Sequence, residues 1–416
     1  MKKFFLVLLT ATISFAANAE ESNVSKKEIQ RSETIARDSI RPQLSLKSKD
    51  GKFSVTASGY VNLRASYDFN GSIINPDFIT SLIDVTDAYN TQRRFYFDAT
   101  TSRIEVKGKA ETEKLGDVEL CLNMDFRAGD AGSYTPRLRL AYVAFKGFMF
   151  GRNYTTFSDV TSISPNIDFQ GPNVCPFIYT TQIRYVKPFE SGLTLGAAVE
   201  YIDYTSSSLG DESESSPSGQ TFCYQEKFIP DFVGYLQYKW GEDATSHIRM
   251  TGLYKSIPLY NTVSQSNVNL NGWGMQLSGS LGLSKNVTFY YSGTCGEGIS
   301  NYMQDTYGSG LDATVSSGSA PEASLTPMYG WQVSTLVQLS SRVMASVGYS
   351  AVEIKGNTSK YAADDYKKCD YAFANVFYSL TPRVQLAAEY LWGQRTNFSG
   401  DNGSANRINT MLQYNF

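Results

Sequence analysis

The last twelve residues, Ala405–Phe416, read ANRINTMLQYNF and alternate between two kinds of side chain. In an extended chain, one face would carry Ile408, Thr410, Leu412, Tyr414 and Phe416. The opposite face would carry Arg407, Asn409, Gln413 and Asn415. An alternation with a period of two predicts a β-strand that has one mostly apolar face and one polar face.

The same alternation recurs along the chain in segments of about ten residues. The predicted strands are 53–69, 101–110, 118–126, 137–145, 148–157, 181–187, 192–201, 231–240, 246–255, 271–281, 286–295, 328–339, 342–352, 369–379, 383–393 and 406–416. Short gaps between them alternate strictly with long gaps, such as 70–100, 158–180, 202–230 and 296–327. The pattern predicts an all-β fold, a transmembrane antiparallel up-and-down β-barrel of about 16 strands with short periplasmic turns and long extracellular loops. Both termini would then lie in the periplasm, and closure of the barrel would satisfy every backbone hydrogen-bonding group in the hydrocarbon region.

The N-terminal region has a different character. Lys2 and Lys3 precede an apolar run and a small-residue site at 17–19, which predicts a signal peptide over residues 1–19. Residues 20–50 are predicted to be a short polar periplasmic segment, in which 24–37 has the composition of a short helix, and residues 51–416 the barrel domain. No later run of eighteen apolar residues is found, which excludes transmembrane helices.

Composition narrows the class of protein without deciding it. The chain is 42% hydrophobic, 13% aromatic and 19% charged, which suits a membrane barrel and fits a secreted soluble β-protein almost as well. The formal net charge of −3 gives no indication of a nucleic-acid partner. No cofactor is expected.

The five cysteines, an odd number and widely spaced, argue against a disulfide framework or a zinc site. A bridge between Cys175 and Cys223 stays open as an alternative. Metal binding by the loop carboxylates Asp211, Glu212 and Glu214 is also open, although acidic loops are more often simply solvated.

Parity along each strand assigns side chains to the lumen. The candidate pore-lining, solute-selecting residues are Arg64, Arg103, Arg137, Arg139, Arg152, Arg184 and Arg249. Lys107 and Arg407 are also assigned to the lumen by parity. Arg152 shares a face with Phe148 and Phe150 and is assigned inward, because a guanidinium among acyl chains costs about 2–4 kcal/mol at mid-membrane.

Neighbouring strands place several of these cations side by side. Arg137, Arg139, Arg152 and Arg184 would form a basic ladder able to hold carboxylate or phosphate groups. The alternative is that they pair with Glu119, Asp125 and loop acids and so brace a wet lumen. A barrel of this size leaves an aqueous channel unless something fills it. The 158–180 segment either folds inward and narrows the channel or is an ordinary surface loop.

Several strings resemble the DcaP-like outer-membrane porins in order and spacing. They are TSRIEVKG at 101–108, GDVELCLNMDF at 116–126, RLRLAYV at 137–143, GRNYTTFSD at 151–159, QIRY at 182–185 and GEGISNY at 296–302. The resemblance implies a trimeric sixteen-strand porin for passive diffusion, in which Arg137, Arg139 and Arg184 contribute to a basic lumen, and a preference for dicarboxylates and other small anions. The family often carries a longer N-terminal helical coiled coil, which is here reduced to the short segment at 24–37.

The sequence therefore favours a passive diffusion channel for small hydrophilic solutes. The expected partners are the lipid bilayer, small solutes, two further copies in a homotrimer, and the barrel assembly machinery through Phe416. An adhesin or structural barrel that acts through its long loops is the alternative. An enzyme is not expected, because the single histidine, His247, would lie at the periplasmic end of the ninth strand and could not serve an outward-facing nucleophile.

Overall fold

The structure is a computed structural model that describes residues 44–71, 73, 75–86, 92–129, 133–202, 222–241, 245–316, 322–356 and 360–416. The predicted signal peptide, the helix expected at 24–37 and the loop acids at 211–214 lie outside the described residues. In the described part of the chain, no helix is long and apolar enough to cross a bilayer.

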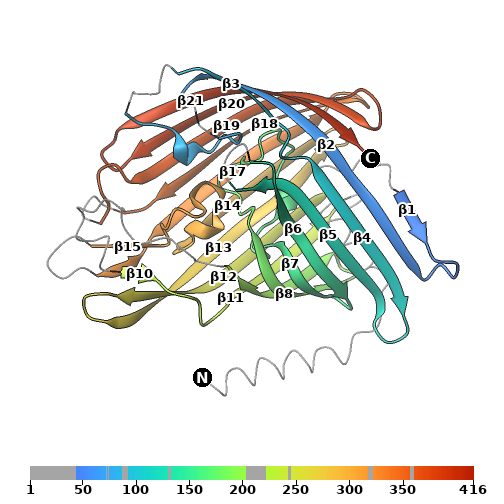
Figure 1. The fold of residues 1–416 in the computed structure, drawn as a ribbon, viewed down its shortest axis with the longest axis horizontal. Helices are drawn as coiled ribbons and strands as arrows, with labels where there is room; N and C mark the ends of the chain where they lie inside the picture. Colours follow the sequence, from blue (N-terminus) through green and yellow to red (C-terminus); the bar gives the residue numbers. More distant parts are fainter. Residues whose placement is uncertain are drawn as a thin grey trace.

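The described strands form one large sheet that closes on itself (Figure 1). The strands of the wall are β2 (Phe53–Asn70), β3 (Arg94–Asp98), β4 (Arg103–Thr112), β5 (Gly116–Ala128), β6 (Thr135–Phe145), β7 (Phe148–Tyr154), β8 (Tyr179–Pro188), β9 (Leu193–Tyr201), β11 (Asp231–Trp240), β12 (Ser246–Asn261), β13 (Ser266–Ser284), β14 (Val287–Glu297), β17 (Pro327–Gln338), β18 (Val343–Ile354), β19 (Tyr366–Ser379), β20 (Val384–Asn397) and β21 (Asn402–Asn415). Successive wall strands pair antiparallel, and β21 returns to pair with β2. β3 and β4 pair with different parts of β2 and together act as one strand, so the predicted sixteen-strand barrel is confirmed.

The two faces of the wall carry opposite kinds of side chain. On β13, Met275 and Leu277 are exposed on the outside, whereas Gln276 and Ser278 are buried inside the barrel. The C-terminal strand shows the same inversion, because Ile408 and Leu412 are exposed while Arg407 and Asn409 are buried. An apolar exterior and a polar interior are what a barrel in a bilayer requires.

The hairpin connections differ between the two ends of the barrel. At one end, here called the turn end, the connections are tight, as in the two-residue turn Lys146–Gly147, where both residues have positive φ. A turn with positive φ at both central residues matches the twist of the flanking strands, and glycine adopts that conformation without strain. The opposite end, here called the loop end, carries the long connections.

The predicted strict alternation of short and long gaps is wrong at two places. The hairpins β12–β13 and β20–β21 are closed at the loop end by only residues 262–265 and 398–401. The strands continue well past the predicted boundaries there, and on Ser266–Asn271 the apolar Val268 and Leu270 pack inward while the asparagines are exposed. On β13 the alternation continues in this extension, but the apolar face is now the inner one, so the test for a lipid-facing apolar side misses it.

Two shorter strands extend the sheet. β1 (Leu44–Lys47) pairs with the first part of β2, so the predicted polar segment 20–50 ends in an ordered strand. β10 (Phe222–Tyr224) pairs with the upper part of β12 above β11. A separate two-stranded hairpin, β15 (Ala313–Val315) with β16 (Ala323–Leu325), lies in the connection between β14 and β17.

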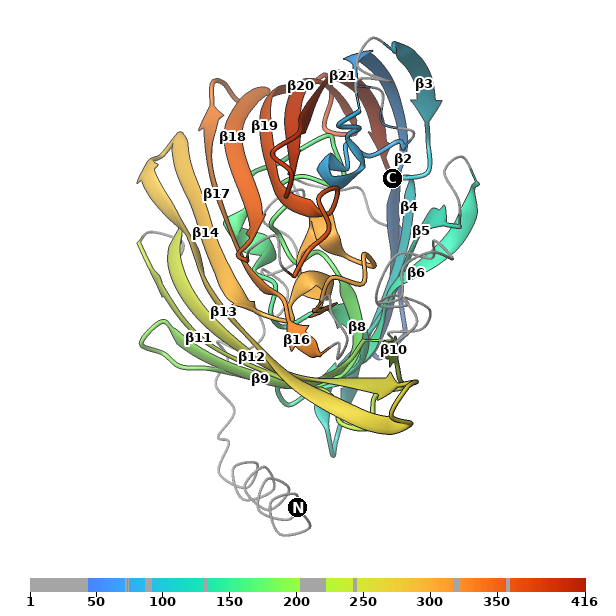
Figure 2. The same cartoon turned by 90° about the vertical axis from the view of Figure 1, so that its left-hand side faces the viewer.

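The buried apolar residues lie inside the barrel and not outside it. Three connections fold into the lumen, namely the described residues of 71–86, with the short helix η1 (Thr80–Leu82), residues 155–178, with η2 (Val160–Ser162), and residues 298–316, with η4 (Ser300–Tyr302) and η5 (Gln304–Thr306) (Figure 2). The largest cluster joins side chains of the second and third connections, such as Phe157, Val174 and Tyr302, to inward residues of the wall.

Candidate functional site in the lumen

Loop 155–178 crosses the lumen from β7 to the opposite wall. The backbone N–H groups of Ile167 and Asp168 donate to the two carboxylate oxygens of Glu389 on β20, at 2.9 and 2.7 Å. Nearer the start of the loop, Gln332 Nε2 on β17 donates to the Ser162 carbonyl at 2.7 Å. The inward course that the sequence left open is therefore the one adopted, and it narrows the lumen.

The other two inward connections interlock with this loop. Asp168 Oδ1 accepts the backbone N–H of Phe78 at 3.0 Å, and the backbone N–H of Asp305 donates to the Asn173 carbonyl at 3.0 Å. Thr80 Oγ1 in turn donates to Asp305 Oδ1 at 2.7 Å. These contacts hold loops 71–86 and 298–316 against loop 155–178 at the loop end.

Two of the predicted pore-lining arginines share the carboxylate of Asp125. Arg137 makes a two-point contact with Asp125, through Nε at 2.9 Å and Nη2 at 2.6 Å. Arg139 is fully buried, with its Nε 3.4 Å from the same carboxylate, and it also donates to the hydroxyl groups of Tyr154 and Tyr179. At these two positions the bracing alternative describes the geometry, because both guanidinium groups are held by Asp125, although its single charge balances only one of them and Arg137 stays partly exposed.

Arg64 and Arg407 are also paired inside the wall. Arg64 Nη2 lies 3.0 Å from Asp98 Oδ2 and 3.3 Å from Asp77 Oδ1. Arg407 contacts both carboxylate oxygens of Asp68, its neighbour across the β2–β21 pair. Both guanidinium groups are buried under loop 71–86, so neither faces a solute.

The inward assignment of Arg152 is wrong. Arg152 pairs with Thr181, and on the same face the neighbouring pair joins Phe150 to Ile183, which is exposed on the outer wall. The Arg152 side chain therefore leaves the wall on the outer side, where its Nε donates to the Leu138 carbonyl at 3.1 Å. A backbone acceptor and the ring of Tyr179 offset the cost that the sequence argument assigned to this placement.

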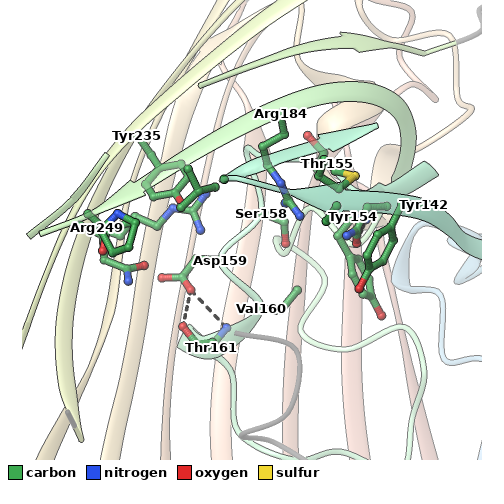
Figure 3. Close-up of a pocket in the computed structure, with 18 of the residues that line it drawn as sticks. Tyr142, Tyr154, Thr155, Ser158, Asp159, Val160, Thr161, Arg184, Tyr235 and Arg249 are labelled. Carbon is green, nitrogen blue, oxygen red and sulfur yellow. Dashed lines mark hydrogen bonds between the residues drawn. The ribbon is translucent and has the colours of Figure 1, made fainter. Parts of the chain in front are cut away.

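Below loop 155–178, towards the turn end, the lumen keeps a cavity of about 110 Å³ (Figure 3). Its cationic lining residues are Arg184 on β8, Lys239 on β11 and Arg249 on β12. The single carboxylate of the lining is that of Asp159, at the start of η2. Arg184 and Arg249 are the two predicted arginines that reach this space, whereas the half-buried Arg103 lies outside the lining, over the ring of Tyr60.

The two arginines at the cavity are held differently. Arg249 lies over the ring of Tyr235, 3.8 Å from its centroid, and its Nη2 donates to the Thr156 carbonyl. Arg184 Nε has no hydrogen-bond partner among the described residues, although the atom is buried. Figure 3 shows both side chains directed into the space above Asp159. A cation with an unused donor in a narrow aqueous space favours an anionic solute.

Asp159 offsets only one of the three positive charges at the cavity, and its oxygens are occupied by other partners. Oδ1 accepts from the backbone N–H and the hydroxyl of Thr161, and Oδ2 lies 2.8 Å from His247 Nε2 and accepts from Ser278 Oγ at 2.7 Å. Burial alone would raise the pKa of this carboxyl, but His247, Arg249 and the hydrogen bonds hold it below its ordinary value.

A Ser–His–Asp chain is present but is not arranged for nucleophilic attack. His247 Nδ1 lies 2.9 Å from Ser280 Oγ, which is buried, lies outside the cavity lining and donates to the Thr245 carbonyl at 3.3 Å. The contacts from Asp159 through His247 to Ser280 attach loop 155–178 to β12 and β13. His247 stands at the turn end of β12, the ninth strand of the wall.

Sequence parity missed part of the lining. Tyr142, Tyr235 and Lys239 line the cavity, yet they were not among the predicted residues. Lys239 follows the inward parity of β11 set by the buried Gln237, so the same test would have found it. The thiols of Cys175 and Cys223 are free, so the bridge considered from the sequence is not formed. The described residues contain no cluster of His, Cys, Asp and Glu side chains that could hold a metal ion.

Comparison with known proteins gives the family. The profile of the DcaP outer membrane protein family matches residues 18–416. The crystal structure of the outer membrane channel DcaP of Acinetobacter baumannii has the same fold, with a TM-score of 0.72 and 18% identity over 89% of this chain and 99% of that one. Salmonella typhi OmpF follows with a TM-score of 0.54 and 11% identity over 89% and 100%, and Pseudomonas putida OprB with 0.53 and 10% over 88% and 95%. No curated protein matches the sequence. Because the family profile covers almost the whole chain, the resemblance found in the sequence is confirmed, and the chain belongs to the DcaP family of outer membrane proteins.

Proposed function

We propose that the protein is a passive diffusion channel of the Gram-negative outer membrane that favours small anions such as carboxylates. The observation that carries the proposal is the cavity under loop 155–178, where Arg184, Lys239 and Arg249 face a single, fully hydrogen-bonded carboxylate. A solute that carries negative charge gains from this surplus of cationic groups, and a cation is repelled by it.

The orientation and assembly belong to the same proposal. Barrels of this kind have short periplasmic turns and longer outer loops, so we place the turn end and both chain termini in the periplasm. The C-terminal Phe416 would engage the barrel assembly machinery, and the protein would act as a homotrimer. An OmpT of Vibrio cholerae with the same general fold, a TM-score of 0.51 and 12% identity was solved in a trimer form.

Conductance and ion selectivity in a planar lipid bilayer test the proposal. The purified protein should form open channels, and the reversal potential under a KCl gradient should favour chloride. The double variant Arg184→Gln, Arg249→Gln should lose most of that preference, because both side chains reach the cavity. Arg152→Gln is the matched control, since Arg152 leaves the wall on the outer side. A preference of the wild-type channel for potassium would refute the anion part of the proposal, and the absence of conductance would refute the channel itself.

A further inference from the structure

Three neighbouring turns at the turn end present the same pair of side chains, a leucine followed two or three residues later by a cation. The pairs are Leu283 with Lys285, Leu339 with Arg342, and Leu380 with Arg383. The leucines are 64, 62 and 48% exposed, and all three cations are exposed. The turns follow one another around the rim, because they close the hairpins β13–β14, β17–β18 and β19–β20.

Charge at this part of the rim has one sign. The turn segments 282–287, 339–343 and 380–384 contain three cations and no acidic residue. The β4–β5 turn differs, because Lys114 there lies between Glu113 and Asp117. The rim is therefore locally basic under β13–β20 and mixed under β4–β5.

The height of the three turns is indicated by aromatic side chains on the outer wall. Tyr378 pairs with Val343, Phe289 with Leu281, and both rings lie on the outward face of their strands. Arg383 Nη1 lies 3.5 Å from the hydroxyl of Tyr414, which is also exposed on the outside. Outward aromatic rings mark the boundary between acyl chains and headgroups. The turns just beyond these rings consequently lie at headgroup depth.

We propose that this three-turn surface, formed by the leucine and cation pairs of the β13–β14, β17–β18 and β19–β20 turns, binds anionic phospholipid headgroups. The phosphate groups would contact Lys285, Arg342 and Arg383, and the three leucines would enter the adjacent acyl boundary. A lipid is the occupant because exposed leucines beside cations match a molecule that carries both an apolar chain and a negative charge. The inference goes beyond the proposed channel function, since the surface faces lipid and not the lumen.

Lipid retention measures this binding directly. The protein is reconstituted in vesicles with equal amounts of phosphatidylglycerol and phosphatidylcholine, extracted in mild detergent at low salt, and the two co-purified lipids are quantified by mass spectrometry. Wild-type protein should be enriched in phosphatidylglycerol. The triple variant Lys285→Gln, Arg342→Gln, Arg383→Gln should lose the enrichment at least fivefold, since each cation near an anionic surface contributes roughly that factor. Extraction in about 0.5 M KCl should lower the wild-type enrichment by screening.

The matched control removes the same charge from another part of the rim. Lys52→Gln, Lys114→Gln, Lys146→Gln changes three exposed cations in the β1–β2, β4–β5 and β6–β7 turns and should keep the enrichment. Both variants should show wild-type heat-dependent gel mobility and conductance, because neither touches the cavity. No enrichment of wild-type protein at low salt, or an equal loss in both triple variants, would overturn the inference. The ratio of co-purified lipids does not depend on conductance. Failure of the channel proposal and failure of the lipid proposal can therefore be distinguished.

The leucines are tested by Leu283→Ser, Leu339→Ser, Leu380→Ser, which keeps all three cations. This variant should retain less phosphatidylglycerol than wild-type protein, since part of the contact is apolar. Full retention by the serine variant would overturn the apolar half of the recognition.

Discussion

Asp159 and His247 lie 88 residues apart in the chain, and Oδ2 of the carboxylate is 2.8 Å from Nε2 of the imidazole. The first residue belongs to the loop that crosses the lumen, and the second to the wall strand β12. Ser278 on β13 donates to the same carboxylate oxygen. Through this contact the beginning of loop 155–178 is fixed against the wall, and its position sets one side of the cavity.

Breaking this contact should loosen the loop. Asp159→Asn removes a buried charged acceptor, which we expect to lower the free energy of unfolding by about 1.5–3 kcal/mol. Single-channel conductance should rise, because the loop segment beside the cavity is no longer held to β12. Asp401→Asn, in an exposed turn, is the control and should change neither quantity. Unchanged conductance together with unchanged stability in Asp159→Asn would contradict the tethering role.

Substitution of Arg139 should affect mainly the stability of the barrel, and substitution of Arg184 should affect mainly its ion selectivity. Arg139→Gln disrupts a buried contact with Asp125 and two tyrosine hydroxyls, so unfolding in denaturant should become easier by about 3 kcal/mol. Arg184→Gln should leave stability nearly unchanged and shift the reversal potential, because its guanidinium reaches the cavity. The prediction fails if Arg139→Gln alters selectivity more than Arg184→Gln does.

Gly151 should not tolerate a side chain. Its φ of +134° is available almost only to glycine, and an added Cβ would lie 2.2 Å from the Ala141 carbonyl oxygen. We expect Gly151→Ala to destabilise the barrel by more than about 1 kcal/mol, as measured by the midpoint of unfolding. Gly252→Ala and Gly293→Ala are the controls, because an added Cβ at either position meets no atom within 4 Å. Equal unfolding midpoints for all three variants would contradict the prediction, because the wall would then accommodate a side chain at Gly151 without loss of stability.

The carboxyl of Asp168 should make stability depend on pH. Burial, reinforced by the nearby charge of Asp77, raises its pKa above the ordinary value. A carboxyl with a raised pKa binds its proton more tightly in the folded than in the unfolded state, so its contribution to stability grows as the pH falls through the folded pKa. The stability difference between wild-type protein and Asp168→Asn should therefore increase in favour of wild type as the pH is lowered from neutral towards about 4. Thermal unfolding of both proteins across that pH range measures this stability difference. A difference that shrinks as the pH falls would contradict the prediction.

The sequence predicted the wall well because lipid imposes a simple rule on it. Residues such as Leu412 and Met275 had to be apolar to face acyl chains, and their neighbours were free to be polar. The rule fails above the apolar region, and the extensions of β12 and β13 up to residues 261 and 266 were therefore missed. It also failed at Arg152, because a backbone acceptor on Leu138 and a tyrosine ring made an outward guanidinium tolerable.

The sequence by itself determined the barrel, its number of strands and the polarity of its two faces, because these follow from a two-residue period read locally along each strand. Only the tertiary structure decided which inward arginines are neutralised by carboxylates and which reach an open space. Asp125, Asp98 and Asp68 contact their arginines across strand pairs. Loop 155–178 is held in place by hydrogen bonds to His247 and Glu389, which are far away in the sequence. Contacts between residues so far apart in the chain leave no periodic mark in the sequence, since they depend on the closure of the sheet around the loop.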